Sequence, residues 1–318
     1  MHCTRNPLSI NVFNQNSAVM IRKAILATDL SKASDLLMES IPEYKKLGIE
    51  EIILFHVPTI SFNYMEYSGY SMRVHIEARM INHSNRLAEQ GIRSSYVFKE
   101  GLPSQEIVDF ALTHPDAMII IGSKGQGFFK RNLIGSTTLR VIQQSRNPVL
   151  MIRIKNLGKN EEGSAECTLE TRELASHGLL LTDFSKNSGK AFDFAENHLV
   201  ENLETISLMH VQDKVIMKHH DPETIKKFNK IDTGRLQNCT ISLRQKTKAP
   251  VHCVLTEGAV VPEIIREVKQ HEVSLVVLGT HGKGYFSDMV LGSTASAITQ
   301  LVEANCLFIP MEAEKEES

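Results

Sequence analysis

Short apolar runs of strand length alternate with longer amphipathic segments along the whole chain. In the first part we predict strands at residues 24–27, 52–57, 95–98, 117–121 and 149–154. Helices are predicted between them at residues 34–47, 73–90, 103–112 and 137–144. The run at 117–121 has no polar alternation, which is typical of a strand covered on both faces. Strands that alternate with helices in this way predict a parallel sheet with helices on both sides.

The second part of the chain repeats this order of elements. Its predicted strands lie at residues 178–181, 206–211, 251–255, 275–278 and 307–309. Its predicted helices lie at residues 189–202, 222–246, 261–270 and 294–301. The intervening segment at 155–172 is polar and contains two glycines and four glutamates, so we interpret it as a linker. We therefore predict domains at residues 20–155 and 174–311, joined by a linker at 156–173.

Two short motifs recur at the same spacing in both halves. Thr28-Asp29-Leu30-Ser31 follows the first predicted strand, and Thr182-Asp183-Phe184-Ser185 follows its counterpart 154 residues later (28 to 182). The second strands end in Phe55-His56-Val57 and, at the same spacing, in Met209-His210-Val211. An ordered series of matches at one spacing indicates a duplication.

A glycine motif of the form G-x2-G-x9-G-S-T follows the fourth predicted strand of each half. In the first half it consists of Gly122, Gly125, Gly135, Ser136 and Thr137. In the second half, 157 residues later (122 to 279), it consists of Gly279, Gly282, Gly292, Ser293 and Thr294. One three-residue insertion after the second strand of the second half reconciles all three motifs, which supports the duplication.

The position of the glycine motif predicts an anion site. It lies at the carboxyl end of a buried strand and leads into a helix, where open α/β sheets hold ligands. Free backbone N–H groups at a helix N-terminus bind phosphate, and glycines let the backbone approach it closely. The alternative is that the glycines only serve tight turns. The P-loop pattern GxxxxGK[ST] is absent, and no dinucleotide-binding GxGxxG follows the first strand.

These motifs together resemble the universal stress proteins, and among them the members that retain ATP binding. The resemblance spans about residues 21–153 and 178–310. It implies an α/β fold with two open five-stranded parallel sheets in the order 3-2-1-4-5. It also implies that the family's usual dimer, in which last strands pair, forms here within one chain as an intramolecular pseudo-dimer between 149–154 and 307–309.

The resemblance also implies a ligand and the residues that hold it. The ligand would be ATP or AMP, with Mg²⁺ accompanying ATP. Val57 and Val211 would offer backbone contacts to adenine. The nucleoside and ribose region would be lined by Ala27, Thr28 and Asp29 in the first half, and by Leu181, Thr182 and Asp183 in the second. The phosphates would be held by the two glycine motifs, that is by Gly122, Gly125, Gly135, Ser136 and Thr137, and by Gly279, Gly282, Gly292, Ser293 and Thr294.

Several single residues allow two interpretations. Asp29 and Asp183 end apolar strands and would contact a ligand, or cap the helix that follows. We assign His56 and His210 a packing role with one hydrogen bond and no part in catalysis. His219-His220-Asp221 is expected in a solvated turn and not in a metal site.

The connection after the second strand of the first half is long and aromatic. Residues 58–74 include Phe62, Tyr64, Tyr67 and Tyr70, which would form a lid over the nucleotide or a small cluster under a loop. The basic residues in or near the two glycine loops would neutralise phosphates or lie at the surface; they are Lys124, Lys130, Arg131 and Lys283.

Composition narrows the class of protein. The formal net charge of −2 gives no general attraction to nucleic acid or to an anionic membrane. The first twenty residues contain no continuous apolar run, so we expect no secretory signal. Five cysteines are scattered singly with no CxxC pair, which favours reduced thiols and a cytoplasmic location.

The sequence predicts a stress-response protein that binds adenine nucleotide and acts as a sensor or regulatory module. An enzyme that hydrolyses or transfers ATP on a related fold is one alternative, although no second carboxylate or base is placed to activate a nucleophile. A nucleotide-free scaffold for protein interactions is another. A protein partner is expected without an identity, and a homodimer of the tandem chain is left open.

Overall fold

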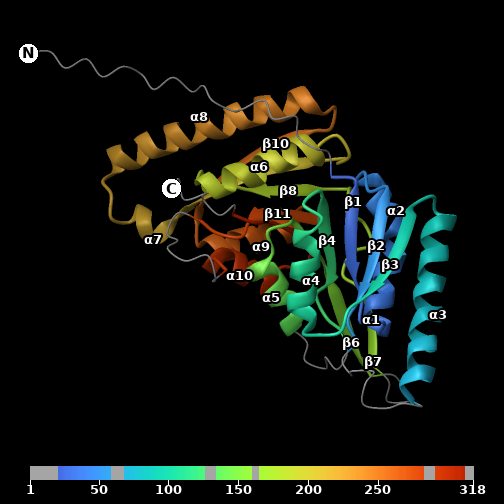
Figure 1. The fold of residues 1–318 in the computed structure, drawn as a ribbon. Coiled ribbons are helices and arrows are strands. Elements are labelled where there is room, and N and C mark those ends of the chain that lie inside the picture. The colour runs from blue at the N-terminus through green and yellow to red at the C-terminus, as the bar shows by residue number, and fades with distance from the viewer. Residues whose placement is uncertain (1–20, 59–67, 126–133, 160–164, 283–290, 312–318) are drawn as a thin grey trace, which may run out of the picture.

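In a computed structural model, the chain forms one ten-stranded sheet with helices packed on both faces (Figure 1). The structure describes residues 21–58, 68–125, 134–159, 165–282 and 291–311. No helix within these ranges combines the length and apolar character needed to cross a bilayer.

The elements of the two halves follow each other in the same order. The first half contains β1 (Lys23–Ala27), α1 (Lys32–Asp35), the 3₁₀ helix η1 (Leu36–Ser40), α2 (Ile41–Lys46), β2 (Glu51–His56), α3 (Ser68–Glu89), β3 (Arg93–Phe98), α4 (Pro103–Leu112), β4 (Ala117–Gly122), α5 (Ser136–Gln144) and β5 (Val149–Ile152). The second half contains β8 (Gly178–Leu181), α6 (Lys186–His198), β9 (Ile206–Asp213), α7 (Lys214–Met217), α8 (Pro222–Lys246), β10 (Val251–Gly258), α9 (Val260–Gln270), β11 (Leu275–Gly279), α10 (Ser293–Leu301) and β12 (Asn305–Ile309).

The strand order confirms the predicted topology. Across the sheet it runs β10-β9-β8-β11-β12-β5-β4-β1-β2-β3, so each half has the order 3-2-1-4-5. The last strands, β5 and β12, pair antiparallel, with Leu307 opposite Leu150, which makes the halves a pseudo-dimer within one chain. Because the halves run in opposite directions, the carboxyl ends of their strands lie at opposite ends of the sheet.

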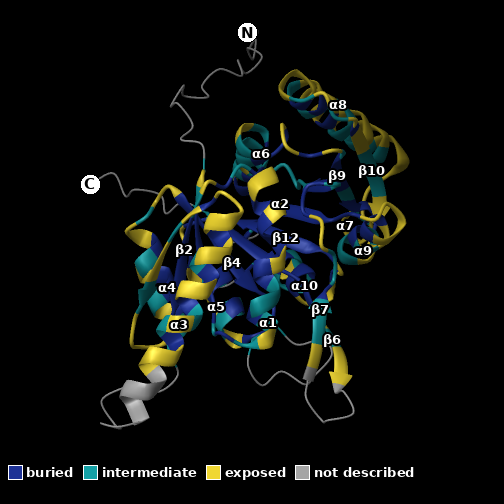
Figure 2. Ribbon diagram, turned by 90° about the vertical axis from the view of Figure 1, so that its right-hand side faces the viewer, coloured by how far each residue is buried: buried dark blue, intermediate teal, exposed yellow. Residues whose placement is uncertain are grey.

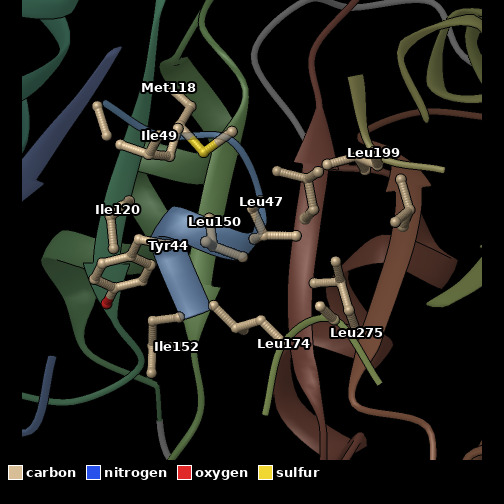
Figure 3. Packing of buried hydrophobic residues seen from close by; sticks show 14 of the residues in the cluster. Tyr44, Leu47, Ile49, Met118, Ile120, Leu150, Ile152, Leu174, Leu199 and Leu275 are labelled. Atoms are coloured by element: carbon tan, nitrogen blue, oxygen red, sulfur yellow. The ribbon is translucent and has the colours of Figure 1, made fainter. Parts of the chain in front are cut away.

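Each face of the sheet is covered by helices from both halves. One apolar cluster includes residues of η1, α2 and α3 together with α6 and α8, and the other includes residues of α4 and α5 together with α9 and α10. The first cluster runs without a break across the junction, where Leu47 and Leu174 lie between Leu150 and Leu275 (Figure 3). The hydrophobic core therefore belongs to the pair of halves and not to each half alone.

The helices differ clearly from the prediction in four places. One is α6, which was predicted at 189–202 and is observed at Lys186–His198. The helix expected at 34–47 is broken into α1, η1 and α2, and Pro42 lies at the start of α2, where its missing N–H is tolerated. α3 begins at Ser68 instead of Arg73. α7 was not predicted; the Asp213 side chain caps it by accepting a hydrogen bond from the Val215 N–H at 2.8 Å.

The connection between the halves is more ordered than a polar linker. Its strands β6 (Ile154–Lys159) and β7 (Ala165–Leu169) pair antiparallel and project from the molecule (Figure 2). Only Ile154 and Leu169 are fully buried among the hairpin residues described, so the sequence shows little strand pattern. Beyond the hairpin, Glu43 of α2 accepts hydrogen bonds from the N–H groups of Leu174 and Ala175, which fixes the chain against the first half.

A buried arginine joins the two halves beside the paired strands. Arg153 follows β5, and its guanidinium donates to the carbonyl oxygens of Thr299 and Gln300, each at 2.6 Å. These carbonyls belong to the last turn of α10, where a cation is favourable. The Arg153 N–H donates to Asn305 Oδ1 at 2.9 Å, and Asn305 corresponds to Pro148 of the first half. The equivalent hydrogen bond cannot form in the other half, because Pro148 has no side-chain amide.

We predict that Arg153→Met lowers the free energy of unfolding by about 2 kcal/mol, because two hydrogen bonds from a charged donor are lost in a buried place. Urea unfolding followed by circular dichroism measures the change. Arg172→Met is the matched control, since the Arg172 side chain is 77% exposed in its ion pair with Glu39 and should change stability little. Equal effects of both substitutions would show that Arg153 does not hold the halves together.

Candidate functional site

The turn after β1 is closed by its own side chains. Thr28 Oγ1 accepts a hydrogen bond from the Leu30 N–H at 3.0 Å, and Asp29 Oδ1 accepts one from the Ser31 N–H at 3.0 Å. Leu30 has a φ of 56°, in the left-handed region that residues other than glycine seldom adopt. The two side-chain hydrogen bonds hold the turn in this conformation.

The turn after β8 has the same geometry. Thr182 Oγ1 accepts from the Phe184 N–H at 3.1 Å, and Asp183 Oδ1 accepts from the Ser185 N–H at 2.9 Å. Phe184 has a φ of 58°. Backbone strain of this kind persists where the surroundings fix it, and it is concentrated at functional sites. Its presence at the same place in both halves marks these turns as candidates for function.

Each of these aspartates lies directly against the second glycine of the neighbouring loop. A Cβ added at Gly125 would overlap the carboxylate of Asp29, and one added at Gly282 would lie 2.9 Å from Asp183 Oδ2. An alanine at either glycine would therefore force the aspartate carboxylate to move. Helix capping, one of the two predicted roles for Asp29 and Asp183, is carried out by the serines Ser31 and Ser185 instead. Oδ1 of each aspartate closes its turn, and Oδ2 faces the glycine loop.

The third glycine of each loop starts a helix. Gly135 is the N-cap of α5, and its N–H donates to the Ser123 carbonyl at 2.9 Å. Gly292 is the N-cap of α10, and its N–H donates to the Thr280 carbonyl at 2.9 Å. Neither N-cap glycine has a side chain to cap its helix, so the first N–H groups of each helix are directed toward the loop. This arrangement suits an anion.

The structure brings most of the predicted site residues together at the carboxyl ends of the strands. They lie on three segments in each half. The first is the strand end and turn, with Ala27, Thr28 and Asp29, or Leu181, Thr182 and Asp183. The second is the second strand, where Val57 directly follows β2 and Val211 lies within β9. The third is the glycine motif, with Gly122, Gly125, Gly135, Ser136 and Thr137, or Gly279, Gly282, Gly292, Ser293 and Thr294. The middle of each loop, with Lys130, Arg131 and Lys283, lies outside the described residues.

His56 of β2 and His210 of β9 each form a hydrogen bond with the turn of the neighbouring strand. His56 Nδ1 donates to the Thr28 carbonyl at 2.8 Å, and His210 Nδ1 donates to the Thr182 carbonyl at 2.8 Å. Both rings are buried, and burial lowers the pKa of His56 below its usual value. One hydrogen bond in a packed position is the role predicted for them. Each histidine therefore fixes the carbonyl of the threonine that starts its turn.

Lys124 is not a surface lysine. Lys124 is only 8% exposed, and this burial lowers the pKa of its ammonium group. The positive charge of Arg153 lowers this pKa further, whereas the negative charge of Glu170 raises it. Glu170 follows strand β7, so this lysine interacts with the hairpin side of the loop. The surface explanation for Lys124 is therefore wrong.

Sequence reasoning missed the arginines that hold the two turns. Arg79 of α3 donates to the carbonyl of Leu30 and binds both carboxylate oxygens of Asp35 at 2.8 Å. In the second half, the guanidinium of Arg235 on α8 lies 5.3 Å from the centroid of the Phe184 ring. The signal that would have found them is the pattern R-[ML]-x-N, which occurs at 79–82 and at 235–238.

The remaining candidates fall outside the site or outside the described residues. Asp221 caps α8 by accepting from the N–H groups of Glu223 and Thr224 at 2.9 and 3.0 Å, which gives it the role of a turn residue. Most of the aromatic connection, residues 59–67, is not among the described residues, and Tyr70 lies in α3.

Comparison with known proteins shows to which family the chain is similar. The sequence model of the universal stress protein family matches residues 20–153 and 178–310. The universal stress protein MJ0577 of Methanocaldococcus jannaschii is 28% identical over 160 residues, which cover 44% of this chain and 99% of that protein. The universal stress protein YxiE of Bacillus subtilis is 32% identical over 72 residues, covering 23% of this chain and 49% of that protein.

Solved structures of whole tandem length share the fold. A universal stress protein from Archaeoglobus fulgidus has a TM-score of 0.66 at 21% identity, covering 91% of this chain and 98% of that one. A putative universal stress protein from Pseudomonas aeruginosa has a TM-score of 0.62 at 14% identity, covering 92% of this chain and 94% of that one. With the family match over both halves, this chain belongs to the universal stress protein family.

Proposed function

We propose that this protein binds one adenine nucleotide in each half and acts in the stress response as a nucleotide-dependent regulatory module. The observation that carries the proposal is the contact between an aspartate turn and a glycine loop, found at Asp29 and Gly125 and again at Asp183 and Gly282. A duplicated loop that serves only as a tight turn would not require a carboxylate against the same glycine in both halves.

The proposed roles follow the chemistry of each segment. The backbone of Val57 or Val211 would contact adenine. Asp29 or Asp183 would accept a hydrogen bond from a ribose hydroxyl or from a metal-bound water. The amides of the glycine loops and of the first turns of α5 and α10 would bind the phosphates, because aligned N–H groups stabilise negative charge without a basic side chain.

Magnesium would accompany ATP, and the donor set fits a weakly held ion. Mg²⁺ is usually bound by one or two carboxylates together with phosphate oxygens and water. The described residues contain no group of three acidic, histidine or cysteine side chains placed to hold a metal. One carboxylate in each half, Asp29 or Asp183, would therefore act together with the phosphates of the nucleotide.

We further propose a cytoplasmic location and a protein partner that reads the nucleotide state. The location is favoured by the single, unpaired cysteines; Cys167, Cys239, Cys253 and Cys306 are all free thiols in the described chain. The two sites open at opposite ends of one sheet, so a partner at one end would contact one nucleotide only.

The purified protein is predicted to release adenine nucleotide when it is denatured, at up to two molecules per chain. Chromatography of the supernatant measures the release. After removal of bound nucleotide, ATP at a hundred times its Kd should stabilise the fold by about 2.7 kcal/mol for each occupied site, seen as a rise in Tm. If no nucleotide is released and ATP leaves the Tm unchanged, the protein is a nucleotide-free scaffold instead.

Gly125→Ala and Gly282→Ala are each predicted to reduce the ATP stoichiometry from two to one per chain. The added methyl group would displace the carboxylate of Asp29 or Asp183 from its turn. Isothermal titration calorimetry measures the stoichiometry. Gly189→Ala is the control, because a Cβ there meets no atom within 4 Å, and it should leave both sites intact. Two sites remaining in both loop variants would contradict the assignment.

An ATP-hydrolysing enzyme is the second candidate, since bound Mg·ATP needs little more than positioning for slow hydrolysis. The double variant Asp29→Asn, Asp183→Asn separates the two candidates. We expect ATP binding in the wild type without turnover above the rate in buffer, measured by phosphate release. Turnover in the wild type that disappears in this variant would instead support an enzyme.

A further inference from the structure

A cavity of about 150 Å³ lies beside the base position of the first half. It is found at the carboxyl ends of β2 and β3, and α3 forms its outer wall. Its lining residues are Pro58, Ile76 and Phe98, with Arg73, Lys99 and Glu100. Pro58 directly follows Val57, whose backbone is proposed to contact adenine. The cavity therefore begins where the proposed base contact ends.

The same place in the second half is filled by a hydrogen-bonded pair. Gln212 follows Val211 as Pro58 follows Val57, and Asp232 lies three residues before Arg235 as Ile76 lies three before Arg79. Gln212 Nε2 donates to Asp232 Oδ2 at 2.9 Å, and Gln212 is only 6% exposed.

His210 and Arg235 also lie close to the carboxylate of Asp232. His210 Nε2 lies 3.6 Å from Asp232 Oδ2, and Arg235 Nη1 lies 3.7 Å from Asp232 Oδ1. Opposite His210 the edge strand β10 carries Leu255, where the first half has Phe98 opposite His56. The two halves therefore differ in both shape and polarity next to the base.

We infer that the first half accepts adenine nucleotides that carry a ring-sized apolar group on the exocyclic amine, and that the second half rejects them. This inference rests on the proposed nucleotide function. A backbone N–H and C=O at Val57 would recognise the edge of adenine that carries its amine, so a group on that amine extends past Pro58 into the cavity. A cavity of about 150 Å³ has the volume needed for a benzene ring, and Pro58, Ile76 and Phe98 make part of its wall apolar.

The walls of the cavity suit such a ring. Ile76 and Phe98 provide apolar contact, and the cations of Arg73 and Lys99 attract an aromatic face. In the second half, the ring would have to separate Gln212 from Asp232. That leaves the buried Gln212 amide and the partly buried Asp232 carboxylate without each other, which is unfavourable.

The test uses N6-benzyl-ATP and chains with one working site. Gly282→Ala keeps the site of the first half, and Gly125→Ala keeps that of the second. Calorimetry on the Gly282→Ala chain should give the analogue an affinity close to that of ATP. On the Gly125→Ala chain the analogue should bind at least about tenfold more weakly than ATP, because no space of the right shape is available.

Reciprocal changes then exchange the preference. Ile76→Phe, added to the Gly282→Ala chain, fills the cavity and should weaken binding of the analogue about tenfold while ATP still binds. Gln212→Ala with Asp232→Ile, added to the Gly125→Ala chain, opens the second half and should bring the affinity for the analogue close to that for ATP. ATP binding reports in each case that the variant is folded.

Two results would overturn the inference while leaving the proposed function in place. One is ATP binding in both halves with the analogue excluded from both, and the other is equal binding of the analogue in both. Absence of ATP binding to the wild-type chain would overturn the proposed function, and this inference with it.

Discussion

The antiparallel pairing of β5 with β12 is the interaction on which the architecture depends. It joins two five-stranded sheets into one, gives both halves a common core on each face, and removes two sheet edges that would otherwise be exposed. It also reverses the direction of the second half. The two candidate sites are therefore held rigidly at opposite ends of one sheet, and each must be completed by residues of its own half.

Within each half, the site is built by fixing a strained turn against a glycine of the neighbouring loop. A threonine and an aspartate close the turn with their side chains, and a histidine holds the threonine carbonyl from behind. An arginine from the long helix holds the residue with positive φ, by a hydrogen bond in one half and by contact with an aromatic ring in the other. The glycine loop can then approach the aspartate because it has no side chain at that point.

Much of the fold could be predicted because its signals are local or repeated. Buried strands without polar alternation, helix starts and three motifs at nearly constant spacing predicted the elements of both halves and their duplication, whereas the strand order was implied only by the family resemblance. The hairpin β6–β7 was missed because only Ile154 and Leu169 of its described residues are fully buried, so its sequence has little pattern. Arg79 and Asp232 were missed because their roles depend on which helix packs over which turn. Contacts between residues that are distant in the sequence cannot be read from local patterns. The insertion of three residues in the second half also changes the spacing between equivalent positions.

The central claim is that two loops of backbone amides each bind the phosphates of an adenine nucleotide. Its most direct test is the ¹⁵N–¹H spectrum of the nucleotide-free protein during titration with ATP. The account predicts large shifts of the amide signals of Gly125, Gly135, Gly282 and Gly292, with the signal of Gly189 unchanged. If ATP moves none of these four loop signals, the loops do not bind phosphate and the account is wrong.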